Sequence, residues 1–132
     1  MEDTRKHYWL YVLLLEQDKY YVGITAHKNP ETRIAEHKRG VYGARWTKDH
    51  HFVETIEIVD LGSVTRSEAE NIENRCTYAY MKSKGYQNVR GGKFNYSGKY
   101  RRVGPWFWRD QDFSLLLAFI LMLVAIVAAW NH

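Results

Sequence analysis

The stretch WLYVLLL at residues 9–15, followed after a short polar segment by YYVG at residues 20–23, decides the fold of this chain. Both runs are rich in aromatic and β-branched residues, which favour β-strands. The polar residues 16–19 between them can only make a tight connection, so the pattern predicts a β-hairpin. Residues 11–15 are apolar at every position, which predicts a first strand that is buried on both faces.

Each run carries a tyrosine of interest, Tyr11 in the first and Tyr21 in the second. One interpretation is a pair of core tyrosines, and the other is a pair that acts jointly in catalysis. Side chains alternate between the faces of a sheet, so the two share a face only when the numbers of paired residues have an even sum. A two-residue loop at residues 17–18 would pair Glu16 with Lys19 and separate the tyrosines. A joint role therefore requires a loop of odd length or a bulge.

Composition sets outer limits on the function. The 132 residues provide room for one small domain and an appendage. The 19 Lys and Arg residues outnumber the 15 Asp and Glu residues, and the resulting charge of +4 is a mild bias toward phosphate-bearing partners or anionic membrane surfaces. The single cysteine, Cys76, excludes an internal disulfide bond, and none of the 6 histidines stands in a zinc-ligand pattern with it.

A helix with clear end signals follows the hairpin. Asn29 is a good N-cap for a helix over residues 30–39, which starts with proline, and Gly40 can take the left-handed conformation at its end. Arg33 and His37 are four residues apart and share one face of this helix. They are either two solvated surface residues or part of a site.

The sequence after residue 40 predicts a loop, a strand and a long helix. Residues 41–51 indicate a loop with interleaved aromatic and basic residues, a pattern that suits nucleic acid but is also common in solvated loops. Residues 52–59 form the third predicted strand. A capping box at Thr65 starts a helix over residues 66–84, on which Glu73 borders the apolar stripe and can face the sheet. The stripe consists of Ala69, Ile72, Cys76, Ala79 and Tyr80, and a glycine-rich loop at 85–92 follows the helix.

These features together resemble the GIY-YIG endonuclease domain over roughly residues 8–92. The second triplet of that family is present as YVG at residues 21–23. The first is replaced by WLY or LYV around Tyr11, so that its glycine and isoleucine are lost and its tyrosine remains. The connection at residues 27–30 is slightly longer than usual. The remaining shared features are the intact Arg-x-x-x-His pattern of Arg33 and His37, Glu73 on the long helix, and Asn88 before Gly91 and Gly92.

The resemblance implies an enzyme that cleaves phosphodiester bonds with one divalent cation, Mg²⁺ or Mn²⁺, held by the single carboxylate of Glu73. It implies that Arg33 clamps the phosphate oxygens where negative charge develops. Tyr11 and Tyr21 would orient the attacking water, and Tyr11 would accept its proton. His37 is a second candidate for proton transfer or phosphate contact. Further contacts with the substrate are expected from Asn88, Arg45, Lys48 and Arg90.

The expected fold is therefore α+β, in a domain over residues 1–92. Its three-stranded antiparallel sheet comprises residues 9–15, 20–25 and 52–59, and the helices 30–39 and 66–84 pack on it.

Residues 113–130 form an unbroken apolar run of 18 residues without charge. As a helix this run is about 27 Å long, close to the hydrocarbon thickness of a bilayer. A helix that is apolar all round needs cover on every side, and so small a domain cannot enclose it. The run predicts a transmembrane helix, and the alternative is burial in an oligomer.

The linker between domain and span, residues 93–112, is basic and aromatic. Trp106 to Trp108 on one side of the span and Trp130 at its other end are typical of interfacial aromatic belts. Lys99, Arg101, Arg102 and Arg109 suit DNA backbone or anionic headgroups, and their adjacency to the span favours headgroups. The positive-inside bias predicts a single-pass tail anchor with residues 1–112 on the cytoplasmic or equivalent side.

Two classes of function are open at this point. The first is a membrane-tethered, metal-dependent endonuclease whose partners are DNA and the lipid bilayer. The second is a nuclease fold that serves as a structural or binding module in a membrane-associated assembly such as a virus particle, where it would contact protein partners in the membrane. The intact set of predicted catalytic residues favours the first.

Overall fold

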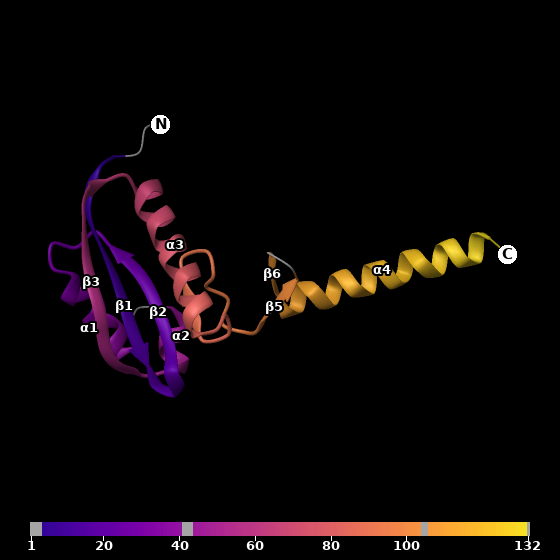
Figure 1. The fold of residues 1–132 in the computed structure, drawn as a ribbon, viewed down its shortest axis with the longest axis horizontal. Helices are drawn as coiled ribbons and strands as arrows, with labels where there is room; N and C mark the ends of the chain where they lie inside the picture. Colours follow the sequence, from indigo (N-terminus) through magenta and orange to yellow (C-terminus); the bar gives the residue numbers. More distant parts are fainter. Residues whose placement is uncertain (1–3, 41–43, 104–105, 132) are drawn as a thin grey trace. The chain divides into compact units, whose positions relative to one another are not determined.

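The structure is a computed structural model that describes residues 4–40, 44–103 and 106–131. It contains two compact units, Met1–Ser97 and Gly98–His132, which are treated separately below (Figure 1). The domain boundaries predicted at residues 92 and 112 stay predictions. The first unit holds the predicted α+β domain, and the second holds the apolar helix.

The first unit is built on a mixed four-stranded sheet of order β3-β1-β2-β4. The antiparallel strands β1 (Lys6–Leu15), β2 (Lys19–Thr25) and β3 (Phe52–Val64) confirm the three predicted strands. The prediction of a wholly antiparallel sheet was wrong, because the short strand β4 (Val89–Gly91) adds to β2 in parallel. β3 also runs past its predicted end at residue 59, since Lys6 at the start of β1 pairs with Val64.

The turn of the hairpin has odd length. Residues Glu16–Asp18 form a tight 3₁₀ turn between Leu15 and Lys19, which are paired across the strands. In this register Leu13 pairs with Tyr21 and Tyr11 pairs with Gly23. Tyr11 and Tyr21 therefore project from the same face of the sheet, as a joint role requires.

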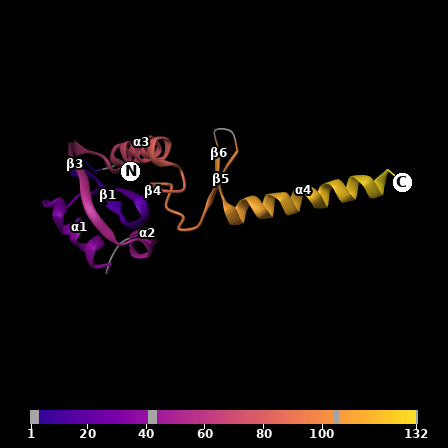
Figure 2. The same ribbon diagram turned by 60° about the horizontal axis from the view of Figure 1, so that its bottom comes forward.

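Helices cover both faces of the sheet. Figure 2 shows α3 (Arg66–Lys84) on one side, and α1 (Pro30–Arg39) and α2 (Arg45–Asp49) on the other. The bounds of α1 and α3 agree with the predictions because their end signals are realised. The Asn29 side chain accepts a hydrogen bond from the Glu31 N–H at 3.0 Å, and Thr65 Oγ1 accepts one from the Glu68 N–H at 3.1 Å.

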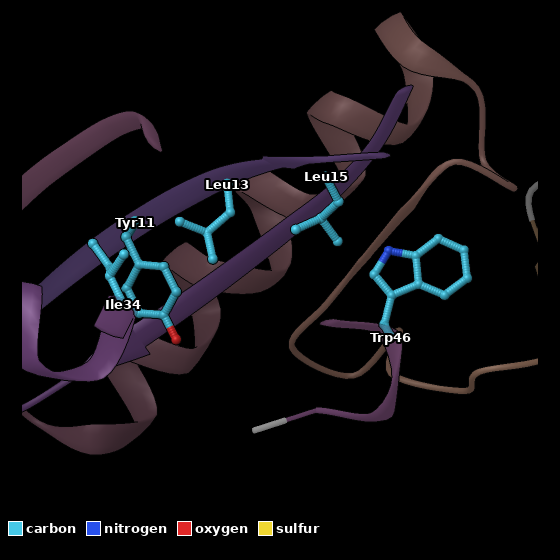
Figure 3. Packing of buried hydrophobic residues seen from close by; sticks show 5 residues of the cluster. All are labelled: Tyr11, Leu13, Leu15, Ile34 and Trp46. Carbon is cyan, nitrogen blue, oxygen red and sulfur yellow. The ribbon is translucent and has the colours of Figure 1, made fainter. Parts of the chain in front are cut away.

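A buried cluster joins the sheet to α1 and α2. Its members Tyr11, Leu13, Leu15, Ile34 and Trp46 are all at most 5% exposed and lie on the Tyr11 face of the sheet (Figure 3). The opposite face of β1 is buried at Val12, which confirms a strand covered on both sides.

The loop predicted at residues 41–51 contains α2, so that prediction was incomplete, and its residues 41–43 lie outside the described residues. Trp46 belongs to the core, and its indole N–H donates to the Tyr20 carbonyl at 3.0 Å. Burial of a tryptophan requires such a partner for its N–H group. A five-residue helix is too short to show an apolar period, which explains why the sequence pattern does not reveal it.

The buried line of α3 is displaced from the predicted apolar stripe. It consists of Ala69, Glu73, Thr77 and Met81, at intervals of four residues. Two polar side chains are thus buried, while Ala79 of the predicted stripe is exposed. Glu73 faces the interior, as its place beside the stripe predicted.

The second unit consists of a hairpin and a long helix. β5 (Tyr100–Val103) and β6 (Trp106–Arg109) pair within the stretch that was predicted as a linker. α4 (Asp110–Trp130) begins three residues before the predicted span, because Asp110 and Asp112 favour the positive end of the helix dipole. Arg101 joins hairpin to helix through a 2.7 Å ion pair with Asp110. An 18-residue window of α4 has a mean hydropathy of 2.7, and the helix is long and apolar enough to cross a membrane.

Candidate active site

The two predicted tyrosines and the predicted histidine converge on the α1 face of the sheet. The ring centroids of Tyr11 and Tyr21 are 6.3 Å apart, and those of Tyr21 and His37 are 5.0 Å apart. The Tyr11 hydroxyl lies 2.8 Å from His37 Nε2. Strands β1 and β2 and helix α1 therefore bring one aromatic cluster together, with Tyr11 and His37 at most 2% exposed.

Gly23 makes room for the ring of Tyr11. A Cβ atom at Gly23 would lie 2.8 Å from Cε2 of Tyr11 and closer still to its Cζ and Oη atoms. The Gly23 backbone does not adopt a positive φ, so space rather than conformation requires glycine here. The glycine of the YVG triplet thus has a direct structural reason.

A short chain of hydrogen bonds lies behind Tyr11. His37 Nδ1 is 3.1 Å from Thr47 Oγ1, and the Thr47 hydroxyl donates to the Ala44 carbonyl at 2.8 Å. Burial, aided by the nearby Arg33, lowers the pKa of His37 to about 4. The imidazole is therefore neutral near pH 7.

Both tyrosine hydroxyls are protonated near neutral pH. Burial, together with the neighbouring Tyr21, raises the pKa of Tyr11 well above its usual value, although Arg33 opposes the shift. Burial, followed by the charge of Glu73, raises the pKa of Tyr21 to about 12. Because the Tyr11 hydroxyl keeps its proton near pH 7, a base that removes this proton has to be hydrogen-bonded to the hydroxyl itself.

Arg33 connects α1 to this cluster. Its Nη1 atom donates to Glu36 Oε2 at 2.7 Å, and its guanidinium lies close enough to Tyr11 to lower the pKa of that hydroxyl against the effect of burial. The side chain is 29% exposed, so part of the guanidinium remains open to an incoming anion. Arg33 can therefore bind a phosphate oxygen while it contacts Tyr11.

Glu73 lies on α3, and, besides burial, its negative charge raises the pKa of both tyrosines. It is 9% exposed, and burial raises the pKa of its carboxyl group to about 7, while a hydrogen bond from the Ile24 main chain opposes the shift. A Cβ atom at Gly92 would overlap Asn74 Oδ1 and lie 3.3 Å from Glu73 Oε1, so glycine is required where the chain passes these two side chains. Asn74 holds the turn there by accepting from the Lys93 N–H at 2.8 Å.

The predicted substrate-binding residues lie outside the aromatic cluster, on α2 and at residues 88–90. Arg45 is exposed and forms a 3.6 Å ion pair with Asp49, and Lys48 is also exposed. The Asn88 side chain accepts from Lys19 Nζ at 2.7 Å and donates to the Lys84 carbonyl at 2.8 Å. These contacts tie the start of β2 to the end of α3.

Arg90 is buried, and its guanidinium binds carbonyl groups of the protein itself. It is 1% exposed, and its guanidinium donates to the carbonyl groups of Tyr86, Val89 and Tyr96 at 2.7–2.9 Å. It also lies 4.5 Å from the ring centroid of Trp46. Arg90 holds the exit loop against α2, which disfavours the predicted contact with substrate.

The sequence did not indicate Thr47 and Gly92 as parts of the site. Thr47 lies in the stretch predicted as a basic loop, and only the fold of α2 brings its hydroxyl to His37. Gly92 ends a glycine pair that was noticed in the sequence, but its contact with Glu73 depends on the path of the chain after β4.

Comparison with known proteins agrees with this arrangement. The family of the GIY-YIG catalytic domain matches residues 7–87, more than half of the chain. No curated protein and no solved structure matches the chain. The resemblance drawn from the sequence is thereby confirmed, and the matched segment includes Tyr11, Tyr21, Arg33, His37 and Glu73. This chain belongs to the GIY-YIG catalytic domain family, which makes it an endonuclease that hydrolyses phosphodiester bonds.

Proposed function

We propose that this protein is a membrane-tethered, metal-dependent endonuclease that cuts DNA. The observation that supports the proposal is the aromatic cluster of Tyr11, Tyr21 and His37 within the matched family domain, with Arg33 on the same helix as His37 and the charge of Glu73 acting on both tyrosines. These five side chains are the proposed catalytic residues.

Glu73 is the proposed metal ligand. Nucleases of this family generally use a divalent metal. Among residues 4–40, 44–103 and 106–131, no group of three or more His, Cys, Asp or Glu residues could hold an ion, so a lone carboxylate has to suffice. Mg²⁺ suits this donor set because it keeps most of its waters and takes one or two carboxylates with substrate phosphate. Mn²⁺ has similar ligand preferences and would suit the same carboxylate. Such an ion would supply Lewis-acid stabilisation of the phosphate and its leaving oxygen.

Arg33 and the two tyrosines have complementary roles in the proposed reaction. Arg33 binds the non-bridging phosphate oxygens, because a planar guanidinium stabilises the charge that develops there. Tyr11 and Tyr21 orient the attacking water, and the Tyr11 oxygen accepts its proton. His37 takes the Tyr11 proton, for which its Nε2 atom is 2.8 Å away.

Exposed basic groups next to the site are proposed to contact the DNA backbone. Arg45 and Lys48 on α2 are exposed, and their charge suits phosphate. Asn88 is also proposed to contact the DNA. Its side chain is hydrogen-bonded to Lys19 and to the Lys84 carbonyl, so it would have to exchange one of these partners.

α4 is proposed to anchor the enzyme in a lipid bilayer. Its 21 residues make a helix about 31 Å long, which matches the hydrocarbon core. The basic residues Lys99, Arg101, Arg102 and Arg109 precede it and favour the cytoplasmic side for the nuclease domain.

The test is cleavage of a labelled DNA duplex by the full chain in detergent micelles. Cutting is expected with Mg²⁺ and is expected to stop with chelator. Glu73→Gln removes the metal ligand but preserves its shape, and it should abolish cutting while DNA binding persists. Glu54→Gln, the same change at an exposed position of β3, is the matched control and should cut normally. Metal-independent cutting, or full activity of Glu73→Gln, contradicts the proposed site.

A further inference from the structure

Three buried side chains form a continuous hydrogen-bonded chain that leads away from the site. It runs from the Tyr11 hydroxyl to His37 Nε2 at 2.8 Å, and from His37 Nδ1 to Thr47 Oγ1 at 3.1 Å. It ends at the Ala44 carbonyl, to which the Thr47 hydroxyl donates at 2.8 Å. Tyr11, His37 and Thr47 are 1%, 2% and 3% exposed, so water is not the natural partner of these groups.

The carbonyl at the end of the chain fixes the direction of every hydrogen bond in it. A carbonyl oxygen can only accept, so the single hydroxyl hydrogen of Thr47 points at Ala44. The Thr47 oxygen then presents a lone pair to His37, and Nδ1 has to carry the hydrogen. A neutral imidazole carries only one ring hydrogen, so Nε2 is an acceptor and Tyr11 is the donor to it.

The opposite tautomer would be penalised at both ends. With hydrogen on Nε2, the Thr47 hydroxyl would have to turn its single hydrogen from the Ala44 carbonyl to Nδ1, so the hydrogen bond between the Thr47 hydroxyl and Ala44 would be lost. The loss of a buried hydrogen bond lowers stability. At the other end, Tyr11 would lose its acceptor.

We infer that Thr47 is a positioning residue of the nuclease, which holds His37 in the Nδ1–H tautomer so that Nε2 can take the proton of Tyr11. This inference rests on the proposed function. Tyr11 gives its proton to His37 Nε2, while its oxygen takes a proton from the attacking water. The water oxygen bonds to phosphorus and the leaving oxygen departs, so that one proton is stored on the imidazole and later released to solvent.

The position of Thr47 is set by α2 rather than by the sheet. The Thr47 N–H also donates to Ala44 at 3.1 Å, so the same carbonyl accepts both groups of this residue. Trp46 fixes the helix through its 3.0 Å hydrogen bond to Tyr20. The buried Thr47 side chain thus supports the site from behind, whereas the exposed side chains of α2 point to solvent.

The first measurement is the tautomer of His37, read from two-bond ¹H–¹⁵N correlations of the ¹⁵N-labelled full chain in detergent micelles at pH 7.5. The wild type should show the Nδ1–H form. Thr47→Val keeps the shape but cannot accept, and it should shift His37 toward Nε2–H, whereas Thr47→Ser should keep Nδ1–H. Thr77→Val is the matched control, because it removes a buried hydroxyl that bonds the Glu73 carbonyl and should not alter His37.

The second measurement is cleavage kinetics of the same variants with Mg²⁺. Thr47→Val should lower kcat by about 10–100-fold, as for loss of a group that orients a site residue, with KM nearly unchanged. Thr47→Ser should restore most of the rate.

Each outcome separates the inference from the proposed function. A wild type that cuts DNA with His37 in the Nε2–H form overturns the inference alone, as does a Thr47→Val chain that keeps both tautomer and rate. A wild type with the Nδ1–H form that cuts no DNA overturns the proposed function alone. The wild-type tautomer requires no variant, so it decides the matter even if Thr47→Val fails to fold.

Discussion

The aromatic cluster depends on single atoms, and the missing Cβ of Gly23 is the clearest case. In Gly23→Ala the new methyl group would overlap the Tyr11 ring, which is held from its other side by His37. Overpacking of this kind costs about 1–3 kcal/mol in unfolding free energy. Because the ring has to move away from His37, cleavage should fall by far more than stability.

A double-mutant cycle tests this explanation by urea unfolding. If the clash is with Tyr11, the same alanine should be much less destabilising in a Tyr11→Ala background, where the ring is absent. Equal costs in both backgrounds would locate the clash elsewhere.

His37 should make stability depend on pH below neutrality. Its pKa is lowered from 6.5 to about 4 in the folded state, mainly by burial. Between these values the unfolded chain binds a proton that the folded chain does not. The stability that comes from keeping His37 neutral is therefore fully present above pH 6.5. As the pH falls to 4, the unfolding free energy drops by roughly 3 kcal/mol.

The matched variant for this prediction is His37→Gln, which cannot titrate. Arg33 and Glu36 face His37 from its own helix, and Tyr11 and Tyr21 face it from the strands. Glu73 acts in the opposite sense, because its pKa of about 7 is raised on folding. The readout is therefore the difference between wild type and variant in thermal unfolding at pH 7 and pH 4.5. A difference that does not change with pH contradicts the prediction.

The site could be predicted from the sequence only where local patterns mark its residues. Arg33 and His37 share a helix face at a spacing of four, and the two tyrosines belong to recognisable strands. Thr47 could not be predicted in this way, since its hydroxyl reaches His37 only because α2 packs against β2 through the hydrogen bond from Trp46 to Tyr20. Arg90 is a second case, because a basic residue beside glycines suggests phosphate, and only the folded exit loop shows that its guanidinium binds internal carbonyl groups.

At the scale of elements, the hairpin turn sets the register on which the site depends. Gln17 and Asp18 have φ values of 62° and 55°, in the region that favours glycine. Gln17→Gly should therefore raise the unfolding free energy by up to about 1 kcal/mol, and Gln17→Val should lower it by at least as much. Urea unfolding of both variants is the measurement. The same sign for both would show that the backbone at Gln17 is not strained.

The predicted elements were confirmed where both ends carry signals. Asn29 and Gly40 bound α1, and Thr65 starts α3. β4 and α2 were missed because they have three and five residues and little pattern of their own. β4 exists because β2 offers it an open edge, as the Tyr20 N–H donating to the Asn88 carbonyl at 2.8 Å illustrates. Such pairing with a distant strand cannot be predicted from the sequence of residues 85–92 alone.

At the scale of the whole molecule, charge and hydropathy divide the chain in two. The family domain lies within residues 1–97, whereas α4 is apolar and none of its hydrophobic stretch is buried. An apolar helix without protein cover is stable in hydrocarbon, not in water. Membrane attachment should therefore depend on the second unit alone, and catalysis on the first.

Removal of residues 98–132 should give a soluble protein that still cuts DNA in vitro, because all five proposed catalytic residues precede the cut.

The full chain should stay in membranes after carbonate extraction, since each apolar residue of α4 favours the bilayer by about 0.5 kcal/mol. Protease added to sealed vesicles should digest the nuclease domain from the cytoplasmic face only, as the basic residues before α4 require. Protection from that face would reverse the orientation, and carbonate release of the full chain would exclude the anchor.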